Sequence, residues 1–139
     1  MSKRLVFGAS GYIGSYLAPF LASQGIEVRA TSRNVDVIAS REWSDVELAE
    51  ADALQEDTLD SVLGGVDIAY YLVHSMAAGK NFPELDAAAA RNFAAAAERQ
   101  GVERIVYLGG LVPDMPKSTH LQSRQETGDI LRAGSVPVT

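Results

Sequence analysis

Short β-rich runs alternate with longer helical patterns along the whole chain of 139 residues. The expected strands are residues 4–7, 27–31, 46–50, 67–73 and 104–108. The expected helices are residues 12–23, 58–63, 83–100 and 120–132, while residues 33–43 follow no regular pattern. Strands and helices that alternate in this way form right-handed βαβ units, with a parallel sheet between two helical layers. The sequence therefore predicts an α/β protein with a doubly wound parallel sheet and three α/β/α layers.

No linker, repeat or low-complexity tract divides the chain, so we expect one domain over residues 1–139. Residues 136–139 read as the start of a sixth strand that has no continuation. This pattern predicts that the domain is the N-terminal portion of a longer protein. An unfinished sheet edge also invites strand pairing between copies, which makes a homodimer an expected partner state.

The composition excludes several classes of partner. The net charge is -6, and the isolated cations Lys3 and Arg4 are not followed by a basic stripe, so we expect no nucleic acid partner. The chain has no cysteine, which excludes disulfides and thiolate chemistry, and no metal site is expected. It also has no signal-peptide pattern and no apolar run near the ~20 residues that span a bilayer. We therefore expect a soluble, cytoplasmic protein that does not bind membranes.

A glycine motif, GASGYIG, fills residues 8–14 between the first strand and the first helix. A pyrophosphate requires backbone N–H groups directed at it and a helix N-terminus behind them. Gly8 permits the tight turn, Gly11 lets the backbone approach phosphate, and Gly14 lets the helix pack closely on the sheet. In this strand-turn-helix context the motif predicts a Rossmann dinucleotide-binding domain, although a glycine turn without a ligand remains the alternative. The residues expected at the phosphates are Gly8, Ser10, Gly11, Tyr12, Ile13 and Gly14.

The residues after the second strand bear on the choice of cofactor. NAD-binding domains usually place an acid there to accept a hydrogen bond from the ribose 2′-hydroxyl, but this strand ends without one. Arg33 lies where a guanidinium can bind a 2′-phosphate, and Ser32 can donate to the same group. The pattern favours NADP(H). Asp36, slightly farther on, keeps NAD(H) as the alternative cofactor, and Arg33 could also be a solvated loop cation.

With GASGYIG, the TSRN of residues 31–34 and the ADA of residues 51–53, the sequence resembles the atypical short-chain dehydrogenase/reductases. The resemblance extends over essentially the whole chain and is greatest to the NmrA-like and epimerase-like members. It implies that Asp52 and Ala53 recognise adenine, although Asp52 could equally cap a turn. It also implies that Leu72, Val73 and His74 line the ribose on the nicotinamide side, although a lone histidine at a strand end is often structural.

The sequence departs from this family at the catalytic positions. Active members carry Ser or Thr at the end of the fifth strand and a Tyr-x-x-x-Lys pair on the next helix, whereas this chain has His120 and Arg124 at the places of the pair. A spacing of four residues puts both on one helical face. His120 can serve as acid or base, and Arg124 can bind ribose or phosphate as a fixed cation. The alternative is a catalytic pair that has decayed, and Ser118 or Ser123 is a candidate for the missing hydroxyl.

Two functions follow from these observations. The first is an NADP(H)-dependent oxidoreductase that acts on a small carbonyl, alcohol or sugar-like substrate. The second is a non-catalytic redox sensor of the NmrA type, which binds the dinucleotide without turnover. Asn92, in the alanine-rich helix, is interpreted as a packing residue.

Overall fold

The computed structural model describes residues 2–73, 82–108 and 119–139. Its strands are β1 (Lys3–Phe7), β2 (Glu27–Ser32), β3 (Val46–Glu50), β4 (Ile68–Tyr71) and β5 (Arg104–Tyr107). Its helices are α1 (Tyr12–Ser23), α2 (Val35–Ala39), α3 (Glu56–Leu63), α4 (Phe82–Arg99) and α5 (Thr119–Ala133). The five strands form one parallel sheet in the order β3-β2-β1-β4-β5. This confirms the predicted Rossmann fold.

The order in which consecutive strands are added to the sheet reverses at β1. The chain adds β2 and β3 on one side of β1, then crosses to β4 and β5 on the other side. Phe7, the last residue of β1, lies in register with Thr31 of β2 and Tyr71 of β4. The strands that flank β1 therefore end level with it, and the connections after them diverge to opposite faces of the sheet.

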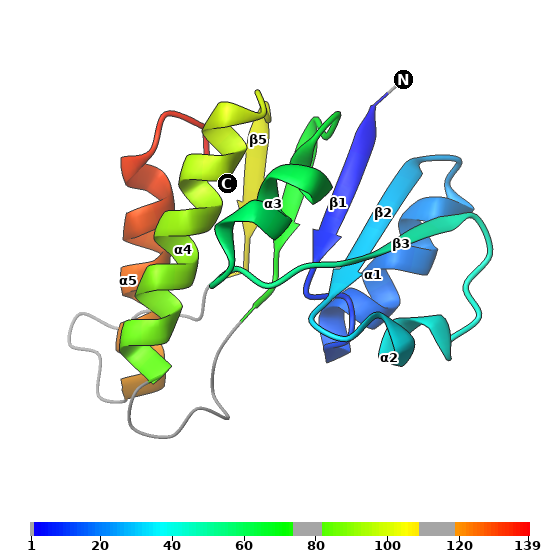
Figure 1. The fold of residues 1–139 in the computed structure, drawn as a ribbon, viewed down its shortest axis with the longest axis horizontal. Coiled ribbons are helices and arrows are strands. Elements are labelled where there is room, and N and C mark those ends of the chain that lie inside the picture. The colour runs from blue at the N-terminus through cyan, green and yellow to red at the C-terminus, as the bar shows by residue number, and fades with distance from the viewer. Residues whose placement is uncertain (1, 74–81, 109–118) are drawn as a thin grey trace.

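Helices cover both faces of the sheet, with α1 and α2 on one side and α3, α4 and α5 on the other (Figure 1). The pleat of β1 sends Val6 to the α1–α2 layer and sends Leu5 and Phe7 to the α3–α5 layer. This explains why the strand reads as a continuous apolar run. Trp43, the single tryptophan, packs in the α1–α2 layer. In the other layer, the rings of Phe7, Tyr71 and Phe93 contact one another.

The expectation of an irregular segment over residues 33–43 was wrong in part, because α2 forms within it. The Asn34 side chain accepts a hydrogen bond from the Asp36 N–H at 3.1 Å and so caps this helix. Its five residues are too few to show a helical period. From the sequence alone, an Asn34 cap that is followed by no apolar repeat cannot be distinguished from a turn.

The expected sixth strand forms its first contacts beside β5. Val138 pairs in parallel with Ile105, and the Thr139 N–H donates to the Ile105 carbonyl at 2.9 Å. The Tyr107 N–H donates in turn to the Thr139 carbonyl at 3.0 Å. The homodimer expected from an unfinished edge stays a prediction. Within the described ranges, no helix combines the length and apolar character needed to cross a membrane.

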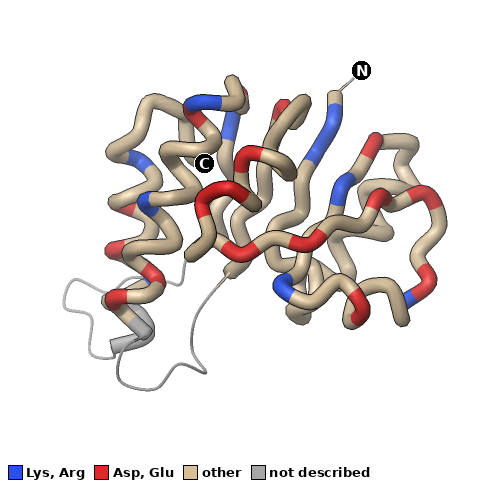
Figure 2. The backbone as a smooth tube through the Cα atoms, viewed as in Figure 1, with Lys and Arg blue, Asp and Glu red and all other residues tan. Residues whose placement is uncertain are grey.

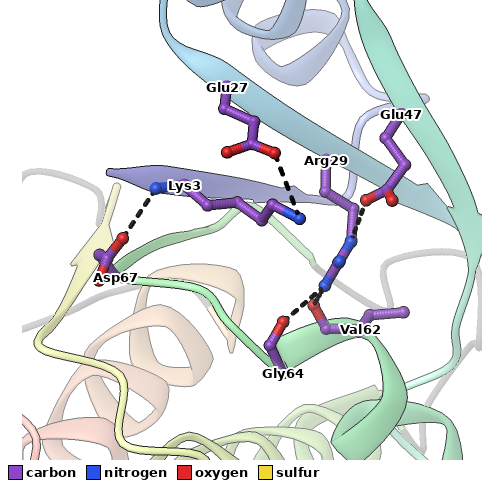
Figure 3. A network of polar contacts seen from close by, with 7 residues as sticks. All are labelled: Lys3, Glu27, Arg29, Glu47, Val62, Gly64 and Asp67. Carbon is purple, nitrogen blue, oxygen red and sulfur yellow. Dashed lines mark hydrogen bonds and ion pairs between the residues drawn. The ribbon is translucent and has the colours of Figure 1, made fainter. Parts of the chain in front are cut away.

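Acidic and basic residues are interspersed along the described chain (Figure 2). The charged side chains therefore interact with one another in small local groups. One such group includes Arg29 of β2, whose side chain is mostly buried (Figure 3). Its guanidinium donates to the Glu47 carboxylate of β3 and to the carbonyls of Val62 and Gly64, at 2.6 and 3.0 Å. These carbonyls lie at the C-terminal end of α3, where helical carbonyls lack partners in their own helix. The hydrogen bond from Arg29 holds the pKa of Glu47 below its ordinary value.

Lys3 extends this group at the amino end of β1 (Figure 3). Its backbone N–H donates to the Asp67 carboxylate at 2.8 Å, and its ammonium lies 3.6 Å from the Glu27 carboxylate of β2. The group therefore joins β1, β2, β3 and α3 at the amino edge of the sheet. The carboxyl edge, where the connections diverge, carries none of these bonds.

Replacing Arg29 by Met should lower the free energy of unfolding by about 2 kcal/mol, because three acceptors lose a charged donor while the aliphatic stem is kept. Urea unfolding measures this change. The matched control is Arg99→Met, which removes an exposed ion pair with Asp60 and should change stability little. Equal unfolding midpoints for Arg29→Met and the unmodified protein would contradict the structural role of Arg29.

Candidate functional site

A cavity of about 180 Å³ opens at the carboxyl ends of β1, β2, β3 and β4. In open parallel sheets, ligands bind in the crevice where the strand order reverses, and this cavity lies at that point. Its walls come from the loop after β1, the ends of β2 and β3, the segment after β4, and one residue of α4. The lining residues are Phe7, Gly8, Ser10, Gly11, Thr31, Ser32, Arg33, Ala51, Asp52, Ala53, Leu54, Leu72, Val73 and Ala89.

Two glycines of the motif are required by the fold itself. Gly8 has a φ of +100°, and a Cβ there would lie 2.8 Å from the Leu72 carbonyl oxygen. Gly14 is buried in the first turn of α1, and a Cβ there would lie 2.5 Å from the Gly8 carbonyl oxygen. Real Cβ atoms do not approach oxygen this closely. The two missing side chains therefore let α1 begin directly above the end of β1.

Gly11 is different, because the protein leaves room for a side chain at this position. Its φ of -76° is open to any residue, and a Cβ would meet the Gly8 carbonyl oxygen only at 3.6 Å, an ordinary contact. Gly11 lines the cavity and is the N-cap of α1, without a capping side chain and without an acid in the first turn. The N-terminus of α1 therefore presents backbone N–H groups that no side chain neutralises, which is an arrangement suited to an anion.

The other predicted phosphate residues divide into two sets. Ser10 lines the cavity, while Tyr12, Ile13 and Gly14 do not. The Tyr12 side chain is 77% exposed and stacks edge-on against Tyr16, and that of Ile13 is 45% exposed. These side chains point away from the lining, so the contribution that remains for Tyr12, Ile13 and Gly14 is that of their backbone N–H groups.

Arg33 and Ser32 both line the cavity at the end of β2. Ser32 is buried, and its hydroxyl oxygen accepts a hydrogen bond from the Asn34 N–H at 3.3 Å. Arg33 is exposed, so its guanidinium stands at the rim in contact with solvent. Asp36 lies in the first turn of α2 and is not part of the lining. The structure thus brings the predicted cation to the cavity and leaves the alternative acid outside it.

The segment after β3 forms the opposite wall. Asp52 and Ala53 both line the cavity. The Asp52 carboxylate accepts the Leu54 N–H at 2.9 Å, as a turn cap does, and the recognition of adenine by these two residues stays a prediction. Asn92 of α4 donates from its side-chain amide to the Ala53 carbonyl at 2.9 Å. The packing role expected for Asn92 is therefore incomplete, because the bond reaches a residue that lines the cavity.

Leu72 and Val73 line the cavity beside β4, where the Leu72 N–H donates to the Phe7 carbonyl at 2.9 Å. His74, predicted beside them, lies outside the described residues. The lining also includes residues that were not among the predicted site residues, namely Phe7, Thr31, Ala51, Leu54 and Ala89. Leu54 and Ala89 belong to no motif, and Ala89 reaches the cavity only through the packing of α4. Among the described residues, no group of His, Asp and Glu side chains is arranged for a metal ion.

The predicted catalytic positions lie on α5. His120 belongs to this helix, but its side chain lies outside the described part of the chain, as does Ser118. Arg124 is half-buried, its carbonyl accepts the Tyr107 hydroxyl at 3.0 Å, and burial raises the pKa of that tyrosine. Ser123 is 3% exposed and donates to the Asp86 carboxylate of α4 at 2.9 Å. Ser123 is therefore engaged between α4 and α5, and neither it nor Arg124 lines the cavity.

A pair of serine substitutions separates the two kinds of glycine. Gly14→Ser should lower the free energy of unfolding by about 2 kcal/mol, because its Cβ would overlap the Gly8 carbonyl. Gly11→Ser should leave stability unchanged or slightly raised, because the position has room and serine is a good N-cap. Urea unfolding of both variants measures the difference. Equal losses would mean that Gly11 is as necessary to the fold as Gly14.

Comparison with known proteins agrees with this geometry. A family model described as NAD(P)H-binding matches residues 8–135. Among curated proteins, none matches this sequence.

Solved structures share the fold at low sequence identity. Triphenylmethane reductase from Citrobacter sp. is 21% identical with a TM-score of 0.84, over 99% of this chain and 47% of that chain. The NADPH-dependent quinone oxidoreductase QOR2 from Escherichia coli, solved with NADPH, is 24% identical with a TM-score of 0.81, over 97% and 46%. A short-chain dehydrogenase/reductase superfamily protein from Agrobacterium tumefaciens with bound NAD is 18% identical with a TM-score of 0.78, over 98% and 47%. The chain spans about half the length of these three proteins.

Proposed function

The chain belongs to the NAD(P)H-binding family, and we propose that the cavity above β1–β4 binds the nicotinamide dinucleotide NADP(H) in preference to NAD(H). The observation that carries this proposal is Gly11. The fold has room for a side chain there, so the packing of the protein alone does not account for the glycine. A pyrophosphate against the N-terminus of α1 would account for it, because it needs close approach to the backbone and uncapped N–H groups.

The rest of the lining fits the two ends of the same ligand. Arg33 and Ser32 form a polar rim that suits a ribose 2′-phosphate, since a guanidinium binds phosphate through two parallel hydrogen bonds. Asp52 and Ala53 would meet the adenine base, while Leu72, Val73 and His74 would lie along the nicotinamide side. The position of Asp36 outside the lining supports NADP(H) over NAD(H). Triphenylmethane reductase and QOR2 were solved with NADP(H) and NADPH, and the Agrobacterium protein with NAD.

Replacing Arg33 by Ala should weaken NADPH binding at least about tenfold and NADH binding little, because only NADPH carries the 2′-phosphate. Calorimetric titration of both dinucleotides measures the two affinities. The matched control is Arg41→Ala, which removes an exposed cation that does not line the cavity. Equal losses for NADPH and NADH would contradict the assignment of the 2′-phosphate to Arg33.

We further propose an oxidoreductase that acts on a small carbonyl, alcohol or sugar-like substrate. The dinucleotide, when bound, supplies hydride transfer, and the protein supplies position, charge and the proton. His120 would give a proton to the substrate oxygen or take one from it. Arg124 would hold ribose or phosphate as a cation, since a guanidinium presents several hydrogen-bond donors in one plane. Two of the similar structures are, by their names, a reductase and a quinone oxidoreductase.

A redox sensor that binds without turnover is the second candidate. It is favoured by the Ser123 hydroxyl, which is engaged with Asp86 and so does not replace the hydroxyl missing at the end of β5. Such a sensor would distinguish NADPH from NADP by affinity alone. Both candidate functions use the same cavity, and they differ only in whether residues of α5 take part in catalysis.

Replacing His120 by Ala should lower NADPH oxidation at least about a hundredfold while NADPH affinity is kept, because general acid catalysis contributes a factor of this order. Absorbance of NADPH with a panel of carbonyl compounds measures the rate, and calorimetry measures the affinity. An unchanged rate in His120→Ala would contradict the proton role. Absence of turnover in the unmodified protein, together with unequal affinities for NADPH and NADP, would favour the sensor.

A further inference from the structure

The cavity wall formed by residues 51–54 is tied down by backbone hydrogen bonds. The Ala51 N–H donates to the Ser32 carbonyl of β2 at 3.1 Å, and the Asp52 N–H donates to the Thr58 hydroxyl of α3 at 3.1 Å. A third bond, from the Gln55 N–H to the Asp52 carbonyl at 2.9 Å, closes a turn whose central peptide joins Ala53 and Leu54. A turn closed in this way permits either orientation of its central peptide, so other contacts decide between the two.

That peptide carries hydrogen bonds at both of its polar groups. Its carbonyl, from Ala53, accepts the Asn92 amide at 2.9 Å, and its N–H, from Leu54, donates to the Asp52 carboxylate at 2.9 Å. The three groups thus form one chain that runs from the Asn92 amide through a single peptide plane to Asp52. Bonds linked in this way polarise and align one another. Hydrogen bonds therefore connect Asn92 with Asp52 although the two side chains do not bond directly.

Asn92 can perform this role because α4 is firmly placed. The next residue, Phe93, is fully buried and packs its ring against Phe7 of β1 and Tyr71 of β4, at centroid distances of 4.9 and 4.6 Å. One turn earlier on the same face, Ala89 lines the cavity itself. The Asn92 side chain therefore connects a helix that is fixed on the sheet core with the cavity wall, although Asn92 and Ala53 are 39 residues apart in the sequence.

We propose that Asn92 is a positioning residue for recognition of the purine base, and that it acts through the Ala53–Leu54 peptide on the Asp52 carboxylate. This inference rests on the proposed function, since it assumes that the adenine half of the dinucleotide lies against Asp52 and Ala53. One carboxylate oxygen of this lining residue, Oδ1, is bonded to the Leu54 N–H, so the orientation of the carboxylate is coupled to that of the peptide. A rotated peptide would turn the carboxylate away from a base that offers an amino group.

The test uses ligand halves and Asn92→Leu, which removes the amide donor and nearly keeps the side-chain volume. Calorimetry would measure the affinities of 2′,5′-ADP, of its inosine counterpart and of nicotinamide mononucleotide. Asn92→Leu should weaken 2′,5′-ADP about five- to tenfold, the loss that corresponds to one hydrogen bond, and should reduce the preference for adenine over hypoxanthine. The affinity for nicotinamide mononucleotide should stay unchanged. Arg91→Ala, an exposed change on the same helix, is the control and should alter none of these values.

Each outcome has a definite meaning. If Asn92→Leu keeps both the affinity for 2′,5′-ADP and the preference for adenine, the inference is overturned while the proposed function stands. If the unmodified protein binds no dinucleotide and no 2′,5′-ADP, the proposed function fails and the inference fails with it. If Asn92→Leu does not fold, Asn92→Ser replaces it, since a serine hydroxyl is too short to reach the Ala53 carbonyl. A loss that is equal for the adenine and hypoxanthine ligands would indicate a structural role only and would also overturn the inference.

Discussion

The close approach of backbone to backbone at the start of α1 determines what the rest of this molecule can do. Gly8 lies against the Leu72 carbonyl, and Gly14 lies against the carbonyl of Gly8, at distances that no side chain would permit. These two contacts bring β1, β4 and α1 together at one point. The helix N-terminus is thereby aimed into the crevice where the sheet reverses direction, and its partial positive charge acts there. The cavity, its polar rim and the uncapped helix N-terminus beside it all depend on this junction.

The two edges of the sheet carry different features: a charged network at the amino edge and the cavity at the carboxyl edge. The amino edge holds the mostly buried Arg29 and its three acceptors, which join neighbouring strands to the end of α3 (Figure 3). The carboxyl edge carries the cavity, with Arg33 exposed at its rim and with the wall of residues 51–54 held by hydrogen bonds. The charged contacts of Arg29 are therefore separate from the exposed cation at the cavity. A change of Arg33 leaves the contacts of Arg29 in place.

The sequence predicted much of this arrangement because the signals were local. The apolar runs of β1 and β4 are buried on both faces, and the glycine motif sits directly between a strand and a helix, so both the fold and the first wall of the cavity could be predicted. The short α2 gave no period, since a single Asn34 cap starts it. The role of Asn92 could not be predicted, because its partner is 39 residues away and the bond exists only once α4 has packed on Phe7 and Tyr71. The engagement of Ser123 with Asp86 likewise joins two helices whose pairing no motif marks.

The placement of the single tryptophan has a spectroscopic consequence. Trp43 packs in the α1–α2 layer, while the ring cluster of Phe7, Tyr71 and Phe93 lies in the α3–α5 layer. Tryptophan emission therefore reports the solvent exposure of one face of the sheet, whereas far-ultraviolet circular dichroism reports the helices of both layers. In a domain that unfolds as one unit the two signals change together, and in one whose layers loosen separately they diverge. Trp43 thus gives one half of the core its own natural chromophore.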